Sequence, residues 1–294
     1  MTDSNKSQTS KIAFQGELGA HSHIACRALY PDMAVLPCVR FDEVFAAVQA
    51  GAADLALIPI ENTVAGRVAD IHRLMRGLLQ SRPLYIIGEY FMPIHHQLLA
   101  ASHSTIAQLT HIHSHEMALA QCGALIAELD LTPIVTTDTA GAAREIAAAS
   151  DPTHAAIAGA LAAEIYGLDI LRKNIEDSTT NTTRFLVMSL TQQDVAPDKE
   201  PTPRKIMTSF IFQVKNQPAA LYKVLGCFAN NNVNMTKLES YQPHGFLATQ
   251  FYADIEGHIL DPNIEKAFAA LKTYCDTIQI FGTYPAAPER QNWT

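Results

Sequence analysis

Four polar residues stand directly before an apolar run in the stretch "NIEDSTTNTTRFLVMSL", residues 174–190. They are Asn181, Thr182, Thr183 and Arg184, and the run that follows them, Phe-Leu-Val-Met, has the composition of a buried strand. Their side chains could cap a turn by bonding to nearby backbone groups. Alternatively, the strand delivers them as hydrogen-bond donors into a cleft, which requires a fold that opens beside this strand.

Side chains on a strand alternate between its two faces, and this alternation separates the four residues. In an extended chain Asn181, Thr183 and Phe185 share one face. Thr182 and Arg184 then share the other. We expect Thr183 to point into the cleft, since a fixed hydroxyl is a suitable hydrogen-bond donor. Arg184 is either a carboxylate clamp or a member of a structural ion pair, because arginine suits both uses.

The composition is that of an ordinary soluble protein. The chain has 294 residues, of which 48% are apolar and 17% charged, and this length suffices for two domains with separate cores. Lys and Arg number 21 against 29 Asp and Glu, a net charge of −8, and no basic run is present. A nucleic-acid partner is therefore not expected. If the substrate is an anion, local donors must overcome these acidic surroundings.

No targeting segment is recognisable in the sequence. The first residues, MTDSNKSQTSK, lack the apolar stretch of a signal peptide, and the Ala-rich run before Glu164 is too short to cross a membrane. The five cysteines show no C-x-x-C spacing, which favours reduced thiols. We therefore expect a cytoplasmic protein without a membrane partner.

Short apolar runs alternate with helical periods between residues 11 and 190. We expect strands at 11–14, 34–39, 54–61, 84–91, 111–114, 133–137, 155–158 and 170–175, and helices at 20–30, 41–48, 66–79, from 115, from 140 and at 160–166. This alternation is typical of an α/β domain with a largely parallel sheet and helices on both faces. Such a length forms one large lobe or two smaller ones, and two lobes would leave a ligand cleft between them.

The composition changes at residues 191–205, which carry three prolines, mixed charge and almost no apolar side chains. This segment is expected to be a linker. Beyond it the expected order is strand, helix, strand, strand, helix, strand, which is the ferredoxin-like βαββαβ arrangement. A small module tethered to a cleft-bearing body indicates catalysis combined with regulation.

Five motifs occur along the chain in a recognisable order: "FQGELGAHS" (14–22), "IPIENTVAGRV" (58–68), "TTDTAGAA" (136–143), "AAEIYGLDIL" (162–171) and "NIEDSTTNTTRFLV" (174–187). Together they resemble the prephenate dehydratase family, whose signature is similar to Thr183-Arg184-Phe185 in this chain. The segment "QPAALYKVLGCFANNNVNMTKLES" at 217–240 resembles the ACT regulatory domain that this family carries. The resemblance extends from residue 11 to about residue 283.

The resemblance implies a catalytic body of two subdomains that are similar to periplasmic binding proteins, with the substrate between them. A ferredoxin-like βαββαβ ACT domain follows this α/β body. The expected divisions are a disordered tail at 1–10, the catalytic domain at 11–190, a linker at 191–204, the ACT domain at 205–284 and a loose tail at 285–294.

The resemblance also implies a reaction, the conversion of prephenate to phenylpyruvate for phenylalanine synthesis. The dianion loses carbon dioxide and hydroxide, and aromatisation of the ring supplies the driving force. No metal, redox carrier or other cofactor is needed, in agreement with a sequence that lacks Walker, dinucleotide and zinc-spacing motifs. The enzyme must polarise the departing hydroxyl, hold one carboxylate and keep water from the other.

By motif match, Thr183 takes the position of the essential catalytic threonine, and Glu61 and Asn62 lie in the Pro-Ile-Glu-Asn motif. Asn62 can donate to a carboxylate at any pH. An ionised Glu61 would repel the dianion, so either burial keeps it protonated or a cation pairs with it. The substrate-binding positions implied are Ser22, Thr63, Ser114, Gln121 and Arg184. The two serines and the threonine could equally be simple helix N-caps.

Three histidines alternate along one expected strand. His111, His113 and His115 would share a face, as metal ligands can. No carboxylate or cysteine lies at ligand spacing from them, and the family needs no metal, so we expect no metal site. His95 and His96 are expected at the surface or between the lobes.

The resemblance implies that phenylalanine binds as an effector at an interface between paired ACT modules. The positions implied are Ala219, Ala220, Leu221, Glu239 and Ser240. The sequence departs from the family pattern twice, because Ala219 replaces glycine and Tyr241-Gln242 replace Arg-Pro. Alanine can block a positive φ or the approach of a ligand to the backbone. The sequence therefore leaves the strength of inhibition open.

Two other functions fit the same residues. Arogenate dehydratase differs only in an amine on the substrate side chain, which the sequence does not distinguish. A non-catalytic amino-acid sensor would use the two-lobed body for binding alone, although a sensor need not keep a leaving-group donor such as Thr183. A homodimer is expected because an ACT-type sheet tends to pair its edge strand, and a homotetramer fits equally.

Overall fold

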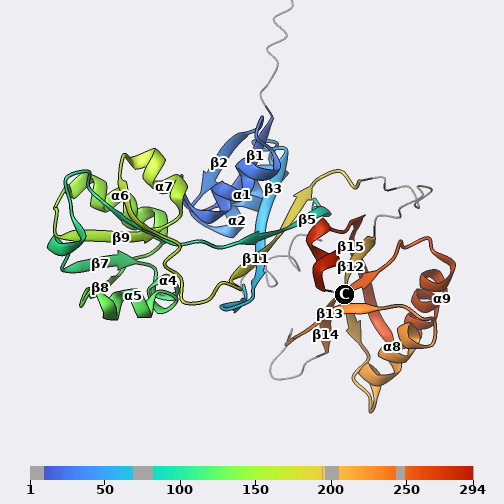
Figure 1. The fold of residues 1–294 in the computed structure, drawn as a ribbon. Helices are drawn as coiled ribbons and strands as arrows, with labels where there is room; N and C mark the ends of the chain where they lie inside the picture. The colour runs from blue at the N-terminus through green and yellow to red at the C-terminus, as the bar shows by residue number, and fades with distance from the viewer. Residues whose placement is uncertain (1–9, 69–81, 194, 196–204, 243–248, 294) are drawn as a thin grey trace, which may run out of the picture. The chain divides into compact units, whose positions relative to one another are not determined.

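The computed structural model describes residues 10–68, 82–193, 195, 205–242 and 249–293. The chain divides into two compact units, one of residues 1–82 and 90–186 and the other of residues 83–89 and 187–294. The first unit contains two lobes, each built on its own sheet (Figure 1).

The N-terminal lobe is built on a mixed sheet with the strand order β2-β1-β3-β11-β5, and β4 pairs with β3 at its side. The strands are β1 (Lys11–Gln15), β2 (Ala34–Cys38), β3 (Leu55–Asn62), β4 (Gly66–Arg67), β5 (Tyr85–Pro93) and β11 (Thr182–Ser189), and the helices are α1 (His21–Leu29) and α2 (Phe41–Gln49). β1 lies parallel to both β2 and β3, as the strand–helix alternation predicts. Of the helix expected at 66–79, residues 66–67 form β4 instead, and 69–79 lie outside the described residues.

The central lobe has the strand order β10-β6-β9-β7-β8. Its elements are β6 (Gln97–Ala100), η1 (Ile106–Gln108), β7 (His111–Ser114), α4 (Glu116–Ala120), α5 (Gly123–Glu128), β8 (Thr132–Val135), α6 (Thr139–Ala149), β9 (His154–Ala158), α7 (Ala160–Tyr166) and β10 (Asp169–Lys173). β7 is parallel to β8 and β9, whereas β6 is antiparallel to β9 and β10. The sheet is therefore mixed rather than largely parallel, because β6 and β10 continue the two segments that enter and leave this lobe.

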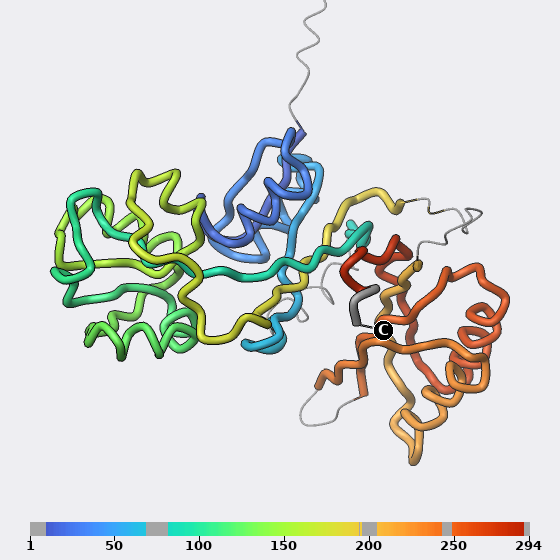
Figure 2. Tube along the Cα trace, viewed as in Figure 1, coloured from blue at the N-terminus to red at the C-terminus, as the bar shows by residue number. Residues whose placement is uncertain are grey.

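The lobes are joined by two crossing segments, β5 to β6 and β10 to β11, which Figure 2 traces between them. Beside these, α1 of one lobe packs against α7 of the other. Gly19 has φ +92, and a Cβ placed there would lie 2.9 Å from the Cα of Ala162, so only glycine permits this approach. The Tyr166 hydroxyl donates to the Leu18 carbonyl at 2.8 Å, which fastens the lobes on this side. Two sheets joined in this way form the periplasmic-binding-protein-like body that the resemblance implies.

Local sequence explains how α6 begins and ends. Asp138 is its N-cap, and its carboxylate accepts from the backbone N–H of Gly141 at 2.7 Å. The helix ends at Ser150, which adopts the left-handed conformation. Alanines dominate its inner face and that of α7, where they pack with Leu99 and Ile146 in one buried cluster. These small side chains let both helices lie close to the sheet.

The C-terminal unit carries a four-stranded sheet in the order β13-β14-β12-β15. Its elements are β12 (Ile206–Val214), α8 (Ala220–Ala229), β13 (Met235–Tyr241), β14 (Gln250–Glu256), α9 (Pro262–Leu271) and β15 (Cys275–Pro285). All its pairings are antiparallel, and the order βαββαβ is the one expected from the sequence. Phe210 contacts Phe228 of α8 and Phe268 of α9, so both helices cover the same face of the sheet.

The end of the chain differs from the expected loose tail. Residues Pro288–Trp293 form the short helix η2. Arg290 in this helix donates to the buried carboxylate of Glu89, from Nη2 to Oε2, at 2.9 Å. A buried carboxylate needs such a partner, and this pairing holds the tail in place. None of the helices that the structure describes is long and apolar enough to cross a membrane.

Candidate active site

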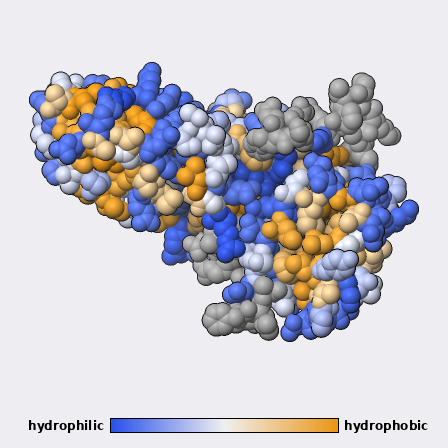
Figure 3. Space-filling model, turned by 60° about the horizontal axis from the view of Figure 1, so that its bottom comes forward, coloured by the Kyte–Doolittle hydropathy of each residue, from blue (hydrophilic) through white to orange (hydrophobic). Residues whose placement is uncertain are grey.

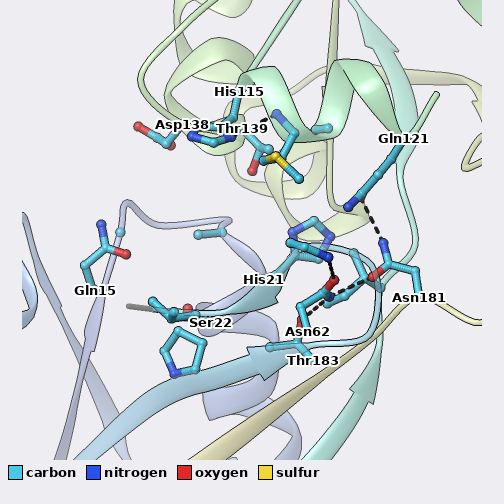
Figure 4. A pocket seen from close by; sticks show the side chains of 18 of the residues that line it. Gln15, His21, Ser22, Asn62, His115, Gln121, Asp138, Thr139, Asn181 and Thr183 are labelled. Atoms are coloured by element: carbon cyan, nitrogen blue, oxygen red, sulfur yellow. Dashed lines mark hydrogen bonds between the residues drawn. The ribbon is translucent and has the colours of Figure 1, made fainter. Parts of the chain in front are cut away.

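A cavity of about 360 Å³ lies between the two lobes of the first unit. Figure 4 shows its labelled side chains facing one another, with Asn62 and Thr183 from the N-terminal lobe on one side and His115 and Asp138 from the central lobe on the other. The lining residues come from α1, the end of β3, the start of β11, α4 and the start of α6. Further lining residues are Gln15 at the end of β1, and Ile94 and His96 between β5 and β6. The cavity thus collects residues from segments that are far apart in the sequence.

Asn62 is held in one orientation by the hairpin that follows it. Its Oδ1 accepts hydrogen bonds from the backbone N–H groups of Val64 at 2.9 Å and Ala65 at 2.8 Å. Backbone N–H groups can only donate, so this atom must be the carbonyl oxygen of the amide. The Nδ2 group therefore faces the opposite way, and it donates to Asn181 Oδ1 at 2.7 Å and to Thr183 Oγ1 at 2.9 Å.

This orientation determines what Thr183 can do. Its oxygen accepts from Asn62, which leaves the hydroxyl proton available for another partner. Among the described residues no group accepts that proton. Thr183 lines the cavity together with Asn181 and Phe185, so the predicted division of the strand into two faces is confirmed. The strand therefore presents a hydroxyl with a free proton to the cavity.

The same chain of hydrogen bonds continues into the central lobe. Asn181 Nδ2 donates to Gln121 Oε1 at 2.9 Å. Gln121 Oε1 lies 3.0 Å from Nε2 of His96, which must carry a proton because an amide oxygen cannot donate. Gln121 is the C-cap of α4, and its own Nε2 group has no acceptor among the described residues. This amide is a second donor available to a ligand.

Helices α1, of 9 residues, and α6, of 11 residues, both begin at the cavity. Ala20, His21 and Ser22 line it at the start of α1, and Asp138 and Thr139 line it at the start of α6. Free N–H groups and the helix dipole at such positions attract anions. None of the described residues that line the cavity is a lysine or arginine. An anion bound here would be held by helix ends, amides, hydroxyls and histidines.

A family model describes this part of the chain. The model of prephenate dehydratase matches residues 12–193, well over half of the sequence. The chain belongs to the prephenate dehydratase family. Members of this family are lyases, and the motif order along the sequence agrees with this assignment.

Relatives with known names support the assignment over nearly the whole chain. A bifunctional N-acyl-homoserine lactone acylase/prephenate dehydratase from Komagataeibacter europaeus is 46% identical over 281 residues, which cover 95% of this chain and 97% of that protein. The chloroplastic arogenate dehydratase/prephenate dehydratase 2 of Arabidopsis thaliana is 36% identical over 285 residues, with 94% and 72% covered. A solved prephenate dehydratase from Arthrobacter aurescens in complex with L-Phe is 28% identical, with a TM-score of 0.82 over 95% of this chain and 93% of that one.

Of the substrate-binding residues that the family motifs imply, Ser22 and Gln121 line the cavity, whereas Thr63 and Ser114 do not. The Thr63 hydroxyl donates to the Thr180 carbonyl at 2.7 Å and accepts from the backbone N–H of Thr182 at 2.9 Å. Ser114 is fully buried, and its hydroxyl donates to the Ile157 carbonyl at 2.7 Å. Both hydroxyls are thus occupied by backbone groups.

Glu61 and Arg184 are also absent from the cavity lining. Arg184 is 2% exposed, and its Nη1 lies 3.4 Å from Oε1 of Glu61. It also lies over the ring of Phe91, with 5.8 Å between the guanidinium carbon and the ring centroid. Of the two alternatives for each residue, the structure therefore supports the ion pair. The pair joins β3 to β11 behind Asn62 and Thr183.

Three histidines line the cavity that the motif match did not assign to the site: His21, His96 and His115. Burial lowers the pKa of His21 to about 4, with a further contribution from nearby His96. The side chain of His115 is the N-cap acceptor of α4, and it receives the N–H of Met117 at 3.2 Å. His96 lies between the lobes, one of the two positions expected for it. His21 and His115 were not expected in the cavity, because no local pattern sets a cavity histidine apart from a surface one.

The other alternating histidines lie elsewhere. His113 Nε2 is 2.7 Å from His154 Nδ1, and the rings of His111 and His154 stack with centroids 4.6 Å apart. Among the described residues no group of three or more His, Cys, Asp or Glu side chains is arranged to hold a metal ion.

The effector positions implied by the family lie in the C-terminal unit. Ala219 is the N-cap of α8 and has φ +61, so the backbone keeps a left-handed conformation although alanine replaces glycine. Ala220 and Leu221 begin the helix. Glu239 and Ser240 lie on β13, and Glu239 forms an ion pair with Lys237 at 3.3 Å.

Proposed function

We propose that this protein catalyses the decarboxylating dehydration of prephenate to phenylpyruvate. The observation that carries this proposal is the direction of the hydrogen bonds at Thr183. Asn62 donates to the threonine oxygen, and Asn62 itself is oriented by two backbone N–H groups, so the threonine proton is directed away from the protein. Together with the family assignment, this donor favours a lyase over a cavity that only binds an amino acid.

The proton of Thr183 serves the departing hydroxyl of the substrate. As the C–O bond breaks, negative charge develops on the hydroxyl oxygen, and a preorganised donor stabilises it at no cost in reorganisation. The donation from Asn62 polarises the threonine hydroxyl and makes its proton a stronger donor. As carbon dioxide leaves, the electron pair of the ring–carboxylate bond enters the ring and forms a new π bond. The pair of the C–O bond leaves with the hydroxide, which takes up a proton to become water, and the ring is then aromatic.

The two carboxylates of the substrate are held by neutral donors in this proposal. Gln121 Nε2, the Ser22 hydroxyl and the N-termini of α1 and α6 are the groups in the cavity suited to this task. Apolar side chains such as Phe185 and Ile94 line the same cavity. They favour departure of neutral carbon dioxide over retention of a carboxylate.

We assign the ion pair of Glu61 and Arg184 a supporting role. It sits on the strands that carry Asn62 and Thr183, and neither charge lines the cavity. Thr63 and Ser114 likewise support the site by fixing backbone segments. The proposed set that contacts substrate is therefore Thr183, Gln121 and Ser22, with Asn62 orienting Thr183.

The test is turnover of the purified protein with prephenate, followed as phenylpyruvate formation, with arogenate in parallel. We expect prephenate to react without added metal or cofactor. Reaction of arogenate alone would replace the proposed substrate with its amine analogue, since relatives that are 34% to 36% identical carry arogenate dehydratase names. If neither substrate reacts, the proposal is wrong and the amino-acid sensor becomes the better interpretation.

The Komagataeibacter europaeus relative is also named as an acylase, and we do not propose that activity for this chain. Amide hydrolysis by a hydroxyl nucleophile needs a base within hydrogen-bond reach of that hydroxyl. Thr183 in the cavity is bonded to Asn62, and among the described residues no cavity serine or threonine hydroxyl is bonded to a histidine. The geometry therefore favours the lyase reaction alone.

We further propose that residues 205–284 form an ACT regulatory domain, joined to the catalytic domain at 11–190 by a linker at 191–204, and that L-phenylalanine binds it. The βαββαβ order and the sheet order β13-β14-β12-β15 support the first statement. The complex of the Arthrobacter aurescens relative with L-Phe supports the second. Inhibition of prephenate turnover by added phenylalanine, with tyrosine as the control, tests this regulation.

A dimer formed through the ACT domain is the proposed assembly. β13 is an edge strand of its sheet, and Leu238 on this strand is 37% exposed. Two further apolar side chains are exposed on α8, Tyr222 at 79% and Leu225 at 36%. Figure 3 shows hydrophobic residues gathered on this unit. Edge strands invite pairing with a second chain, and such a patch would be covered by it. Sedimentation of the wild type and of Leu238→Glu distinguishes a dimer from a monomer.

The cytoplasm is the proposed location. All five cysteines are free, in agreement with a reducing compartment.

A further inference from the structure

One nitrogen atom of the cavity network, Nδ1 of His96, has no partner in the part of the chain that the structure describes. His96 is 3% exposed and lines the cavity, and its Nδ1 makes no hydrogen bond among the described residues. Its other ring nitrogen, Nε2, is bonded to Gln121 Oε1 at 3.0 Å. A buried acceptor without a donor costs free energy, so such an atom indicates a position that a ligand or a proton can satisfy.

The tautomer of His96 follows from the network. Gln121 Oε1 already accepts from Asn181, and it can only accept from His96 as well. Nε2 therefore carries the proton in the neutral ring, and Nδ1 has a free lone pair. A lone pair repels a carboxylate. The proposed substrate carries two carboxylates, and no lysine or arginine is among the described residues that line the cavity.

We propose that the substrate binds together with a proton, which His96 takes up at Nδ1 to form an ion pair with one substrate carboxylate. The proton comes from solvent and returns to it when the product leaves. Nε2 keeps its bond to Gln121 throughout, so the ring does not need to turn. This inference rests on the proposed substrate class, a dicarboxylate, and it adds His96 to the groups that contact it.

The charged and titratable neighbours of His96 are compatible with uptake of one proton, by His96 alone. His21 of α1 meets the ring edge-on with centroids 5.2 Å apart, and burial lowers its pKa to about 4, so His21 stays neutral. Glu176 accepts from the backbone N–H of His96 at 2.8 Å and also pairs with His95 at 2.7 Å. Burial lowers the pKa of His96, whereas Glu176 opposes this effect. A substrate carboxylate would add to the effect of Glu176 and complete the protonation.

Two substitutions of His96 distinguish the role of Nε2 from that of Nδ1. His96→Gln places an amide where Nε2 lies, so it keeps a donor for Gln121 and loses the atom at Nδ1. His96→Asn places a neutral amide near Nδ1, which can donate to a carboxylate at any pH but never takes up a proton. His103→Asn, at an exposed histidine away from the cavity, is the matched control.

The experiment measures kcat/KM with prephenate between about pH 5.5 and 8.5 for the wild type and the three variants. The wild type should lose up to tenfold per pH unit above the pKa of the free ring, because only the protonated ring pairs with the carboxylate. His96→Gln should lose about 10- to 100-fold at the acidic end and show a flat profile. His96→Asn should be flat with a smaller loss, and His103→Asn should match the wild type.

Proton uptake on binding is counted independently by calorimetric titration with prephenate in phosphate and in Tris, whose ionisation enthalpies differ. The titration uses the Thr183→Ala background, in which turnover is slow, because the hydroxide released by turnover itself consumes a proton. If the wild type turns over prephenate and His96→Gln shows the same pH dependence of kcat/KM as the wild type, the inference is overturned and the proposed function stands. If the wild type does not turn over prephenate, the proposed function has failed. Calorimetry then decides alone: uptake that His96→Gln abolishes supports the inference, and binding without uptake, or no binding, overturns it.

Discussion

At the scale of single residues, the site depends on the direction of its hydrogen bonds. Five side chains on both lobes are linked in sequence, from Thr183 through Asn62, Asn181 and Gln121 to His96. Two backbone N–H groups at one end fix the polarity of the whole chain. The network presents donors at Thr183 and Gln121, and these are the groups a departing hydroxyl and a carboxylate require.

Thr183→Ala should lower kcat with prephenate by about 10²–10³, because one preorganised donor to the leaving group is removed. Thr183→Ser, which keeps a hydroxyl, should retain more activity than the alanine variant. Thr182→Ala is the control, since only the backbone of Thr182 is engaged with Thr63. Steady-state kinetics of the three variants decide the matter. An alanine variant within a few fold of the wild type would remove the role assigned to Thr183.

Asn62→Asp should lower kcat by at least about 100-fold while the fold is retained. The introduced carboxylate still accepts from Val64 and Ala65, so the hairpin keeps its bonds. It cannot donate to Thr183, and the threonine proton would turn toward it instead of toward the substrate. Kinetics combined with a thermal unfolding midpoint test this. If the unfolding midpoint falls so far that the variant is partly unfolded under the assay conditions, the loss of kcat indicates a structural role for Asn62 instead.

At the scale of elements, both units place strained or capped helix starts where ligands are proposed. In the first unit Asp138 caps α6 at the cavity. In the second, Ala219 precedes α8 with a left-handed backbone, although the side chain of alanine disfavours that conformation. Ala219 keeps this conformation at the turn that leads into α8. Of the two effects that alanine can have here, a block on the positive φ does not occur.

Ala219→Gly should raise the free energy of unfolding by up to about 1 kcal/mol. Relief of the left-handed strain gives about 1–2 kcal/mol, and the greater freedom of glycine in the unfolded chain takes back part of it. Ala220→Gly is the matched control: it lies within α8, and it should lose about 0.5–1 kcal/mol. Urea unfolding of both variants measures the difference. Equal destabilisation by both would contradict the assigned strain.

At the scale of the whole molecule, the negative net charge requires that the cavity attract an anionic substrate through local groups. The chain carries a net charge of −8 and is proposed to bind a dianion in a cavity without lysine or arginine among its described lining residues. Helix ends and amides provide attraction that does not depend on pH, and histidines provide attraction that does. Buried histidines also link the stability of the fold to pH.

Acidification should destabilise the protein through His21. Its pKa is about 4 in the folded chain and near 6.5 in the unfolded one, so the unfolded state binds more protons between these values. The stability is complete above pH 6.5 and is lost as the pH falls toward 4. Between pH 7 and pH 5 the free energy of unfolding should drop by about 1–2 kcal/mol more in the wild type than in His21→Gln. Urea unfolding at the two pH values tests this, and identical drops would exclude His21 as the source.

The sequence by itself determined the family, the βαββαβ order of the C-terminal unit and the face of β11 that carries Thr183, whereas it did not predict β4 or β6 in the first unit. These follow from local patterns: motif order, apolar periodicity and the alternation of side chains along a strand. The assignment of Thr183, Gln121 and Ser22 to one cleft also came from the motifs, and all three line the cavity.

The tertiary structure alone decided which polar groups are available to a substrate. Asn62 and Asn181 are 119 positions apart in the chain, and Ser114 bonds to a carbonyl 43 positions away, so no local pattern contains these partners. A hydroxyl or carboxylate has only a few hydrogen-bonding positions, and once the fold fills them the group no longer serves a ligand. Thr63, Ser114 and Glu61 are engaged in this way, whereas His96 keeps a free nitrogen.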